Sequence, residues 1–180
     1  KLAFIYRTGH DYLDAITILK NAIDRGCAKT DIYMDLGQIY YDLGMLSKAK
    51  EIFERALVLE PLNALVYVDL GKTMYSMGRH KDAEILFGRA ITLGAKESRV
   101  YLGIAAFFYN RLIFNKAIKN ESRYADIEGL LKKSIEIMPS RIGAYFLLGS
   151  YYYRIGRYTE AKQMYDTMSH YVQDDDYAFG

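Results

Sequence analysis

The sequence predicts an all-α solenoid of stacked helix pairs, because it combines a 34-residue recurrence with amphipathic stripes of helical period and regularly placed glycines. Segment 30–63 contains two helical patterns that meet at Gly44, and segment 64–97 repeats them. A recurrence of this length indicates an array of similar units and not a globule with one centre. The apolar skeleton is kept: Tyr33, Leu36, Gly37, Tyr40, Gly44, Ala49, Phe53 and Ala56 return as Tyr67, Leu70, Gly71, Met74, Gly78, Ala83, Phe87 and Ala90.

The spacing within one unit predicts two amphipathic helices. In the first helix, Tyr33, Leu36 and Tyr40 share one face. The glycine within that face would let a second helix approach at the short end of the usual ~8–10 Å interaxial range. Gly44 suits the tight reversal between the helices, and Pro61 ends the second one because its ring cannot continue the hydrogen-bond ladder. The second helix has its own stripe, formed by Ala49, Ile52, Phe53, Ala56 and Leu57.

One solenoid of five repeats is expected over residues 1–180: a partial repeat over 1–29, two complete ones over 30–63 and 64–97, an enlarged one over 98–141 and a fifth over 142–175. Lys1–Thr8 is expected to be the remainder of the first helix of the partial repeat. The excess of the fourth repeat falls in the insertion 110–123, which lacks Gly and Pro. It therefore predicts a first helix prolonged by about two or three turns to near Asn120. The last helix is expected to end near Val172.

These residues resemble the pattern of the tetratricopeptide repeat family. The aromatic, Leu-Gly, Tyr, Ala, Phe, Ala and Pro positions of that pattern are all met between Tyr33 and Pro61. They are met nearly as well from Tyr67 to Ala95, where Ala95 stands in place of the terminal Pro. The resemblance implies a right-handed α-α superhelix of about five helix pairs. It also implies that the first helix of each repeat lines a concave groove, where family members hold extended peptides or partner helices.

Composition excludes several classes of partner. Of 180 residues, 51% are hydrophobic and 26% charged, and no run approaches the ~18 apolar residues of a membrane helix, so no membrane insertion is expected. A net charge of +2 is too small to predict a nucleic-acid partner. The single cysteine, Cys27, cannot form an internal disulfide, and the compartment stays open. The first ten residues do not have the pattern of a signal peptide. Because the chain begins at Lys1 without an initiator Met and stops at Gly180 after an acidic run, we expect a fragment of a longer protein.

No catalytic, cofactor-binding or metal-binding residues are predicted. The segment 71–73 (GKT) resembles the end of a phosphate-binding loop, but Val66 stands where that motif needs a glycine, and the segment lies inside a predicted helix. His10 and His80 are far apart in sequence, and both fall at predicted turns. The acidic run 174–176 lacks the alternating spacing of a calcium loop. We therefore expect a chain that is not an enzyme and needs no cofactor.

The first helices carry the candidate partner-binding residues. Each has a tyrosine four residues after its small packing residue, which predicts a row of phenols along the groove; such tyrosines also pack neighbouring first helices in the family. A second row is apolar, and apolar side chains that face water gain nothing unless a ligand covers them. The predicted groove residues are Met34, Gln38, Tyr41, Val68, Lys72, Tyr75, Arg99, Leu102, Tyr109, Phe146 and Tyr153, and Ala106 and Ser150 complete a third row.

Charge is unevenly distributed along the predicted array. Thr30–Asn63 carries three basic and six acidic residues, whereas Ser98–Arg141 carries eight basic and four acidic ones. This difference would orient a ligand with its basic part toward the acidic repeat, unless it is unselected surface charge. A carboxylate-binding Lys/Asn/Arg cluster, as some family members have, is not expected, because the corresponding places hold Met34, Gln38, Asp69, Arg99 and Gly103.

The insertion is a second candidate surface, because its basic residues are interleaved with apolar ones. Such a segment either docks a partner or a second copy of the chain, or folds back over the groove. The residues concerned are Arg111, Phe114, Lys116, Lys119 and Arg123.

The sequence therefore predicts a non-catalytic scaffold that binds a polypeptide segment in its concave groove. Two alternatives stay open. One is a self-assembling structural element that forms homo-oligomers through a terminal repeat or the insertion. The other is the docking or regulatory arm of an enzyme whose catalytic domain lies outside this segment. Sedimentation discriminates between the scaffold and the self-assembling element. Dimerisation that Phe114→Asp abolishes favours assembly, and a monomer with an occupied groove favours peptide binding.

Overall fold

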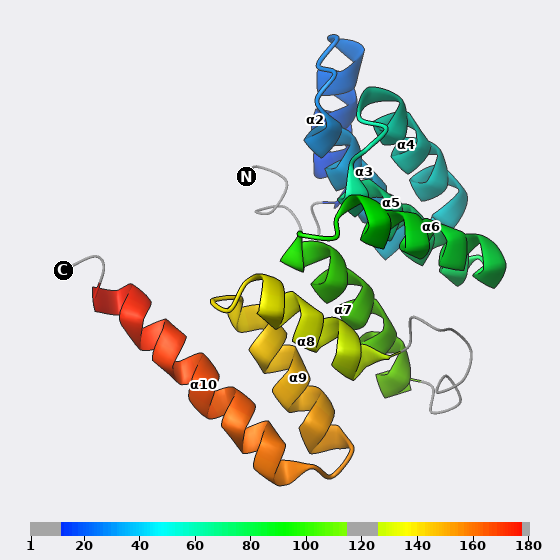
Figure 1. The fold of residues 1–180 in the computed structure, drawn as a ribbon. Helices are drawn as coiled ribbons and strands as arrows, with labels where there is room; N and C mark the ends of the chain where they lie inside the picture. The colour runs from blue at the N-terminus through cyan, green and yellow to red at the C-terminus, as the bar shows by residue number, and fades with distance from the viewer. Residues whose placement is uncertain (1–11, 115–125, 178–180) are drawn as a thin grey trace. The chain divides into compact units, whose positions relative to one another are not determined.

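The computed structural model describes residues 12–114 and 126–177, and every regular element within these ranges is an α-helix. Packing divides the chain into two compact units, residues 1–93 and 94–180. Each unit consists of helix hairpins stacked on one another (Figure 1). The predicted all-α solenoid of paired helices is thus confirmed.

Unit 1, residues 1–93, contains five described helices. Within it α3 pairs with α4, α5 pairs with α6, and α4 packs on α5, while α2 packs on α3. The first helices α3 and α5 also touch each other. The bounds are α2 (Tyr12–Asp24), α3 (Thr30–Asp42), α4 (Leu46–Leu59), α5 (Ala64–Ser76) and α6 (His80–Leu93).

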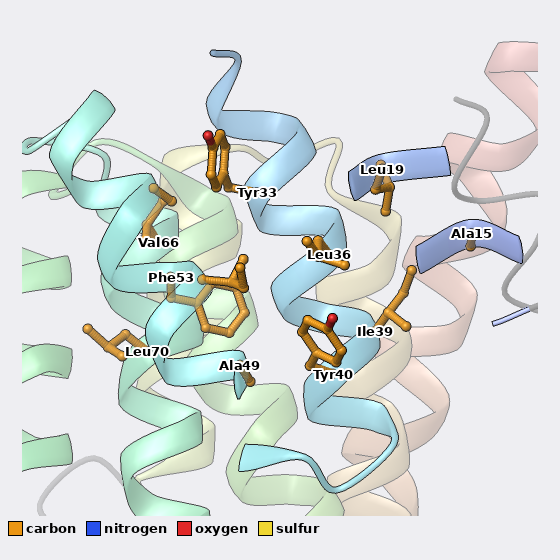
Figure 2. Packing of buried hydrophobic residues seen from close by; sticks show 12 residues of the cluster. Ala15, Leu19, Tyr33, Leu36, Ile39, Tyr40, Ala49, Phe53, Val66 and Leu70 are labelled. Carbon is orange, nitrogen blue, oxygen red and sulfur yellow. The ribbon is translucent and has the colours of Figure 1, made fainter. Parts of the chain in front are cut away.

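The core of unit 1 lies on both sides of α3. Figure 2 shows Ala15 and Leu19 of α2 on one side of that helix and Ala49 and Phe53 of α4 on the other. Ala49 and Phe53 are completely buried. The stripes predicted for the first and second helices of this repeat are therefore the faces that pack together.

Glycines in the left-handed region close the helix hairpins. Gly44 has φ +71°, and its equivalents Gly78 and Gly156 have φ +79° and +84°, a conformation that costs side chains with a Cβ about 1–2 kcal/mol. After Gly44, the Met45 amide donates to the Tyr40 carbonyl at 2.8 Å, which closes the end of α3.

The boundary between the second and third repeats is formed by polar capping. α4 ends at Leu59, just before Pro61, as predicted. Asn63 then caps α5, because its side-chain oxygen accepts from the amides of Leu65 at 3.1 Å and Val66 at 3.4 Å.

Unit 2, residues 94–180, contains α7 (Ser98–Phe114), α8 (Ile127–Ile137), α9 (Ile142–Arg154) and α10 (Tyr158–Tyr177). Successive helices pack as α7 on α8, α8 on α9 and α9 on α10. The first helices α7 and α9 also touch, as α3 and α5 do in unit 1. α9 and α10 run side by side as a long hairpin (Figure 1).

The fourth repeat departs from the others in its first helix. α7 has 17 residues, four more than the 13 of α5, and reaches Phe114. This agrees in direction with the predicted prolongation, but the predicted end near Asn120 lies outside the described residues. Asp126 caps the following helix α8, since its Oδ1 accepts from the Gly129 amide at 2.9 Å.

A charged cluster joins α8, α9 and the turn that precedes α10. The Glu128 carboxylate accepts from Lys132 Nζ at 2.7 Å, from the Tyr152 hydroxyl at 2.9 Å and from Arg157 Nη1 at 2.8 Å. The Arg157 guanidinium also lies over the Tyr152 ring, 4.3 Å from its centroid. Contacts to the Lys132 ammonium first, and then to Tyr152 and Arg157, hold the pKa of the Glu128 carboxyl below its ordinary value.

The predicted end of the last helix was wrong. α10 continues past Val172 to Tyr177. The apolar stripe stops near Met168, but residues 173–177 contain neither Gly nor Pro, so nothing in them interrupts the backbone hydrogen bonds. The predicted remnant helix at Lys1–Thr8 lies outside the described residues.

Candidate functional site

The predicted groove residues of unit 1 lie on two neighbouring first helices. Met34, Gln38 and Tyr41 of α3 are all half-buried. On α5, Lys72 is half-buried, whereas Val68 and Tyr75 are almost fully covered. Tyr75 is only 1% exposed, and the His80 ring packs edge-on against it with a centroid distance of 4.3 Å.

A hydrogen bond joins α3 to α5 within this face. The Tyr41 hydroxyl lies 3.0 Å from Ser76 Oγ. Ser76 follows Tyr75, the equivalent of Tyr41 one repeat later, so the two first helices are linked near their C-terminal ends. The phenol that was predicted to contact a ligand therefore has a structural partner as well.

Lys72 is the cation of this face, and it is already paired. Its Nζ lies 2.6 Å from Asp69 Oδ1, with the two side chains 20% and 15% exposed. Burial alone would lower the pKa of the Lys72 ammonium, but attraction to Asp69, with Tyr41 and Asp42 adding to it, raises that pKa above its ordinary value. Lys72 therefore stays charged and compensates the acidic surroundings.

In unit 2 the corresponding face is formed by α7 and α9. Leu102 and Tyr109 of α7 are half-buried, and Arg99 is exposed at the start of that helix. A Cβ added to Gly143 of α9 would meet Leu102 Cδ2 at 3.6 Å, an ordinary contact distance. The two helices thus approach each other closely at their N-terminal ends.

The exposed part of the face is an aromatic stripe on α9, formed by Phe146, Ser150 and Tyr153. These residues are spaced i, i+4 and i+7 and share one side of the helix. Phe146 is 55% and Tyr153 64% exposed. Ser150 Oγ lies 3.1 Å from the Tyr165 hydroxyl of α10, and the Tyr165 ring lies 6.3 Å from the Phe146 ring.

A tyrosine from the next helix extends the aromatic stripe. The Tyr158 ring, at the start of α10, lies edge-on to Tyr153 with a centroid distance of 5.3 Å, and Tyr158 is itself exposed. Sequence reasoning did not select Tyr158 or Tyr165, because both belong to a second helix. It also missed Asp69 as the partner of Lys72, although the i, i+3 spacing on a helix indicates such a pair.

The second candidate surface is only partly described. Arg111 is half-buried, with its guanidinium 5.6 Å from the centroid of the Phe107 ring. Phe114 ends α7. The side chain of Phe114, together with Lys116, Lys119 and Arg123, lies outside the described residues, so this surface stays a prediction.

The described residues contain no candidate metal-binding cluster, and the segment that resembles a phosphate-binding loop is helical. In 12–114 and 126–177, no three His, Cys, Asp or Glu side chains gather where they could hold a metal ion. Segment 71–73 lies within α5, where Thr73 Oγ1 donates to the Asp69 carbonyl at 2.8 Å. His80 begins α6 and does not lie in the turn before it. None of the helices in the described part of the chain has the length and apolar character that crossing a bilayer requires.

Within each unit, stacked helix hairpins whose first helices touch have the architecture of an α-helical repeat protein. Two segments, residues 30–63 and 142–167, match models of the tetratricopeptide repeat. These two segments are tetratricopeptide repeats (TPR), and proteins built from this repeat are generally non-catalytic scaffolds for protein–protein interaction. No curated protein matches the chain.

Solved structures share this fold at low sequence identity. A crystal structure of MamA is 22% identical, with a TM-score of 0.58, and the match covers 98% of this chain and 97% of that one. PilW, a widely conserved type IV pilus biogenesis factor, is 21% identical with a TM-score of 0.63, covering 96% and 75%. YrrB, a TPR protein with an unusual peptide-binding site, is 18% identical with a TM-score of 0.52, covering 96% and 84%. At these identities the likeness shows the fold alone.

Proposed function

We propose that this chain is a non-catalytic scaffold that binds a polypeptide segment along the faces of its first helices. The observation that carries the proposal is the exposure of Phe146 and Tyr153 on one side of α9. Exposed aromatic rings in a row are unfavourable in water unless a partner covers them. The peptide-binding site of YrrB, a protein of the same fold, supports this reading.

The chemistry of the stripe suits an extended polypeptide. Phe146 offers an apolar face, and Tyr153 combines a ring with a hydroxyl that can pair with a peptide group. Between them, the Ser150 hydroxyl is held by Tyr165 at 3.1 Å, so it is positioned to offer a further hydrogen bond. Aromatic anchors of this kind carry most of the binding free energy in many interfaces.

The corresponding face in unit 1, on α3 and α5, has polar side chains that are already paired. Lys72 and Asp69 form an ion pair, and Gln38 Nε2 donates to Asp42 Oδ1 at 2.7 Å. These groups already satisfy one another, so a ligand would gain less from them than from the uncovered rings of α9. The anchor of the proposed complex is therefore in unit 2.

The test begins with selection of binding peptides from a random peptide library, followed by affinity measurement through fluorescence anisotropy. The variant Phe146→Ala with Tyr153→Ala is expected to weaken the selected peptides at least tenfold, or about 1.4 kcal/mol. Ile85→Ala is the matched control, because Ile85 is 69% exposed on α6 but lies on a second helix. Unchanged affinity in the double variant would place the binding site elsewhere.

Self-assembly is the second candidate function, and the pair Tyr153 and Tyr158 favours it. Two exposed rings packed edge-on at the α9–α10 hairpin form a surface that a second copy could cover equally well. In that case the protein would be a structural element in which the peptide-binding face is an interface between copies. The two functions differ in the concentration dependence of the molecular mass.

A further inference from the structure

A pocket of about 490 Å³ opens in unit 2, between the turn that precedes α7 and the turn that joins α8 to α9. Its lining is strongly basic, with three cationic side chains and one carboxylate, a formal balance of +2. Two apolar side chains complete the wall. The lining residues are Lys96, Glu97, Ser98, Arg99, Ile137, Met138 and Arg141.

The basic residues are not part of what the repeat needs to fold. One repeat earlier, the places of Lys96, Arg99 and Arg141 are taken by Leu62, Leu65 and Glu97. Both earlier repeats form the same helix hairpins without a cation at these places. Two repeats earlier, the same places hold Ala28, Asp31 and Asn63.

The three cations are available to a ligand. Among the described residues, no ion pair involves Lys96, Arg99 or Arg141. Lys96 and Arg99 are exposed. Arg141 is held in place, because its Nε donates to Ser98 Oγ at 3.4 Å and its Nη2 to Met138 Sδ at 2.8 Å. Its remaining N–H groups are free to bind an anion.

Ser98, the hydrogen-bond partner of Arg141, is itself held in place by a second serine. It is buried, and its Oγ lies 2.7 Å from Ser134 Oγ, which in turn donates to the Ser98 carbonyl at 3.0 Å. The serine pair replaces the Thr30–Ala56 and Ala64–Ala90 pairs of the earlier repeats. The repeat that contributes Arg99 and Arg141 is therefore also the one with a buried polar pair that fixes the position of Arg141.

We propose that this pocket binds a phosphate monoester. A phosphate monoester carries about −1.5 to −2 charges at pH 7, which matches the balance of the lining, whereas a single carboxylate would leave the pocket with excess positive charge. Guanidinium groups bind phosphate oxygens through paired N–H donors, and two of them face this pocket. Ile137 and Met138 provide an apolar surface for the carbon side of the ester.

The phosphate group has two sources that the pocket would treat alike: a phosphorylated side chain of a polypeptide, and a small phosphomonoester. The proposal does not depend on the aromatic stripe of α9, so it can fail or hold independently of the proposed scaffold function.

The experiment is titration of the ¹⁵N-labelled chain with O-phospho-L-serine, followed through the backbone amide shifts. The amides of 96–99, 138 and 140–142 are expected to shift in a saturable way, and L-serine is expected to cause no shift. Lys96→Gln with Arg99→Gln is expected to weaken the binding at least tenfold. Lys162→Gln, which removes an exposed cation on α10, is the matched control and is expected to bind like the parent chain. Both substituted cations are exposed, so circular dichroism should show an intact fold.

Two further arms identify the source of the phosphate. Degenerate peptides with a central phosphoserine are compared with the same peptides containing serine, and inorganic phosphate is compared with acetate. Tighter binding of the phosphopeptides than of O-phospho-L-serine supports a polypeptide ligand, and equal binding supports a small phosphomonoester. No saturable shift, equal shifts in the Lys96→Gln, Arg99→Gln variant, or an equal response to acetate would overturn the proposal.

Discussion

The ring of Phe53 occupies the space that a side chain at Gly37 would need, because a Cβ built on Gly37 would lie 2.6 Å from Phe53 Cε1. The same relationship joins Gly71 to Phe87 and Gly149 to Tyr165. In the fourth repeat both places change together, to Ala105 and Leu131, and both are fully buried. A larger residue on the first helix thus accompanies a smaller one on the second, as close packing requires.

Gly37→Ala is expected to lower the free energy of unfolding by about 1–3 kcal/mol, because the new methyl group would displace the Phe53 ring in a closed core. Adding Phe53→Leu should recover part of that loss, since it recreates the pair found in the fourth repeat. Urea denaturation of the two single variants and the double variant measures the coupling between the sites.

Gly143→Ala is the matched control for that experiment. Gly143 is also in a first helix, but its added Cβ would meet only Leu102, at 3.6 Å. The free energy of unfolding should therefore stay the same or rise by a few tenths of a kcal/mol. The upper limit is the difference in helix propensity between Gly and Ala, ~1 kcal/mol. Equal destabilisation by both alanines would mean that the contact with Phe53 is not the cause.

The sequence made the repeat skeleton predictable because its residues are constrained by packing. Gly37, Phe53 and Gly44 each satisfy a steric need that recurs in the third and fifth repeats, so their types and spacing indicate the fold directly. Exposure of the groove residues was less predictable. Tyr75 and Tyr153 hold the same place in their repeats, yet one is covered and the other is open. That difference depends on what each helix meets in space, which periodicity does not encode.

Tyr75→Ala is expected to destabilise the protein by about 3–5 kcal/mol, in the range of other buried aromatic truncations, because the ring is 1% exposed. The variant therefore reports on folding more than on ligand contact. Tyr153→Ala, at the same place in the fifth repeat, should change stability by less than about 1 kcal/mol. Thermal unfolding followed by circular dichroism compares the two, and similar losses would contradict the exposure of Tyr153.

The hydrogen bond between Tyr41 and Ser76 is expected to stabilise the contact between α3 and α5 by about 0.5–1.5 kcal/mol. Tyr41→Phe and Ser76→Ala each remove it with little change in shape. In a double-mutant cycle the second substitution should cost much less once the first is present. Strictly additive losses would show that the two hydroxyls do not depend on each other.

Acid is expected to weaken unit 2 through Glu128. The pKa of its carboxyl lies below the ordinary value of 4.5 in the folded state, chiefly because of the Lys132 ammonium and also because of Tyr152 and Arg157. The stabilisation is therefore fully present above the unfolded-state pKa and is lost as the pH falls through the folded-state value. Glu128→Gln should cost about 1–2 kcal/mol at pH 7, and the difference from the parent chain should shrink below pH ~4.5.

Glu136→Gln controls for the general effect of acid on this helix. Glu136 is on α8 as well, but its one ion pair within residues 12–114 and 126–177 is an exposed i, i+3 contact with Lys133 at 2.7 Å. Exposed pairs of this kind contribute little, so its variant should follow the parent chain at every pH. If the loss of stability in the Glu128→Gln variant stays constant from pH 7 to pH 3, the charged cluster around Glu128 is not the cause of the acid sensitivity.

The scaffold proposal predicts a chain that stays monomeric as its concentration rises, because the aromatic stripe of α9 is reserved for a polypeptide ligand. Sedimentation equilibrium over a wide concentration range measures the mass directly.

If the mass instead doubles, and Tyr153→Asp with Tyr158→Asp restores the monomer, the exposed rings form an interface between copies and the self-assembling element is favoured. If Phe114→Asp restores it and the tyrosine variant does not, assembly proceeds through the end of α7. A constant mass, together with loss of peptide binding in the Phe146→Ala, Tyr153→Ala variant, leaves the scaffold as the function of this face.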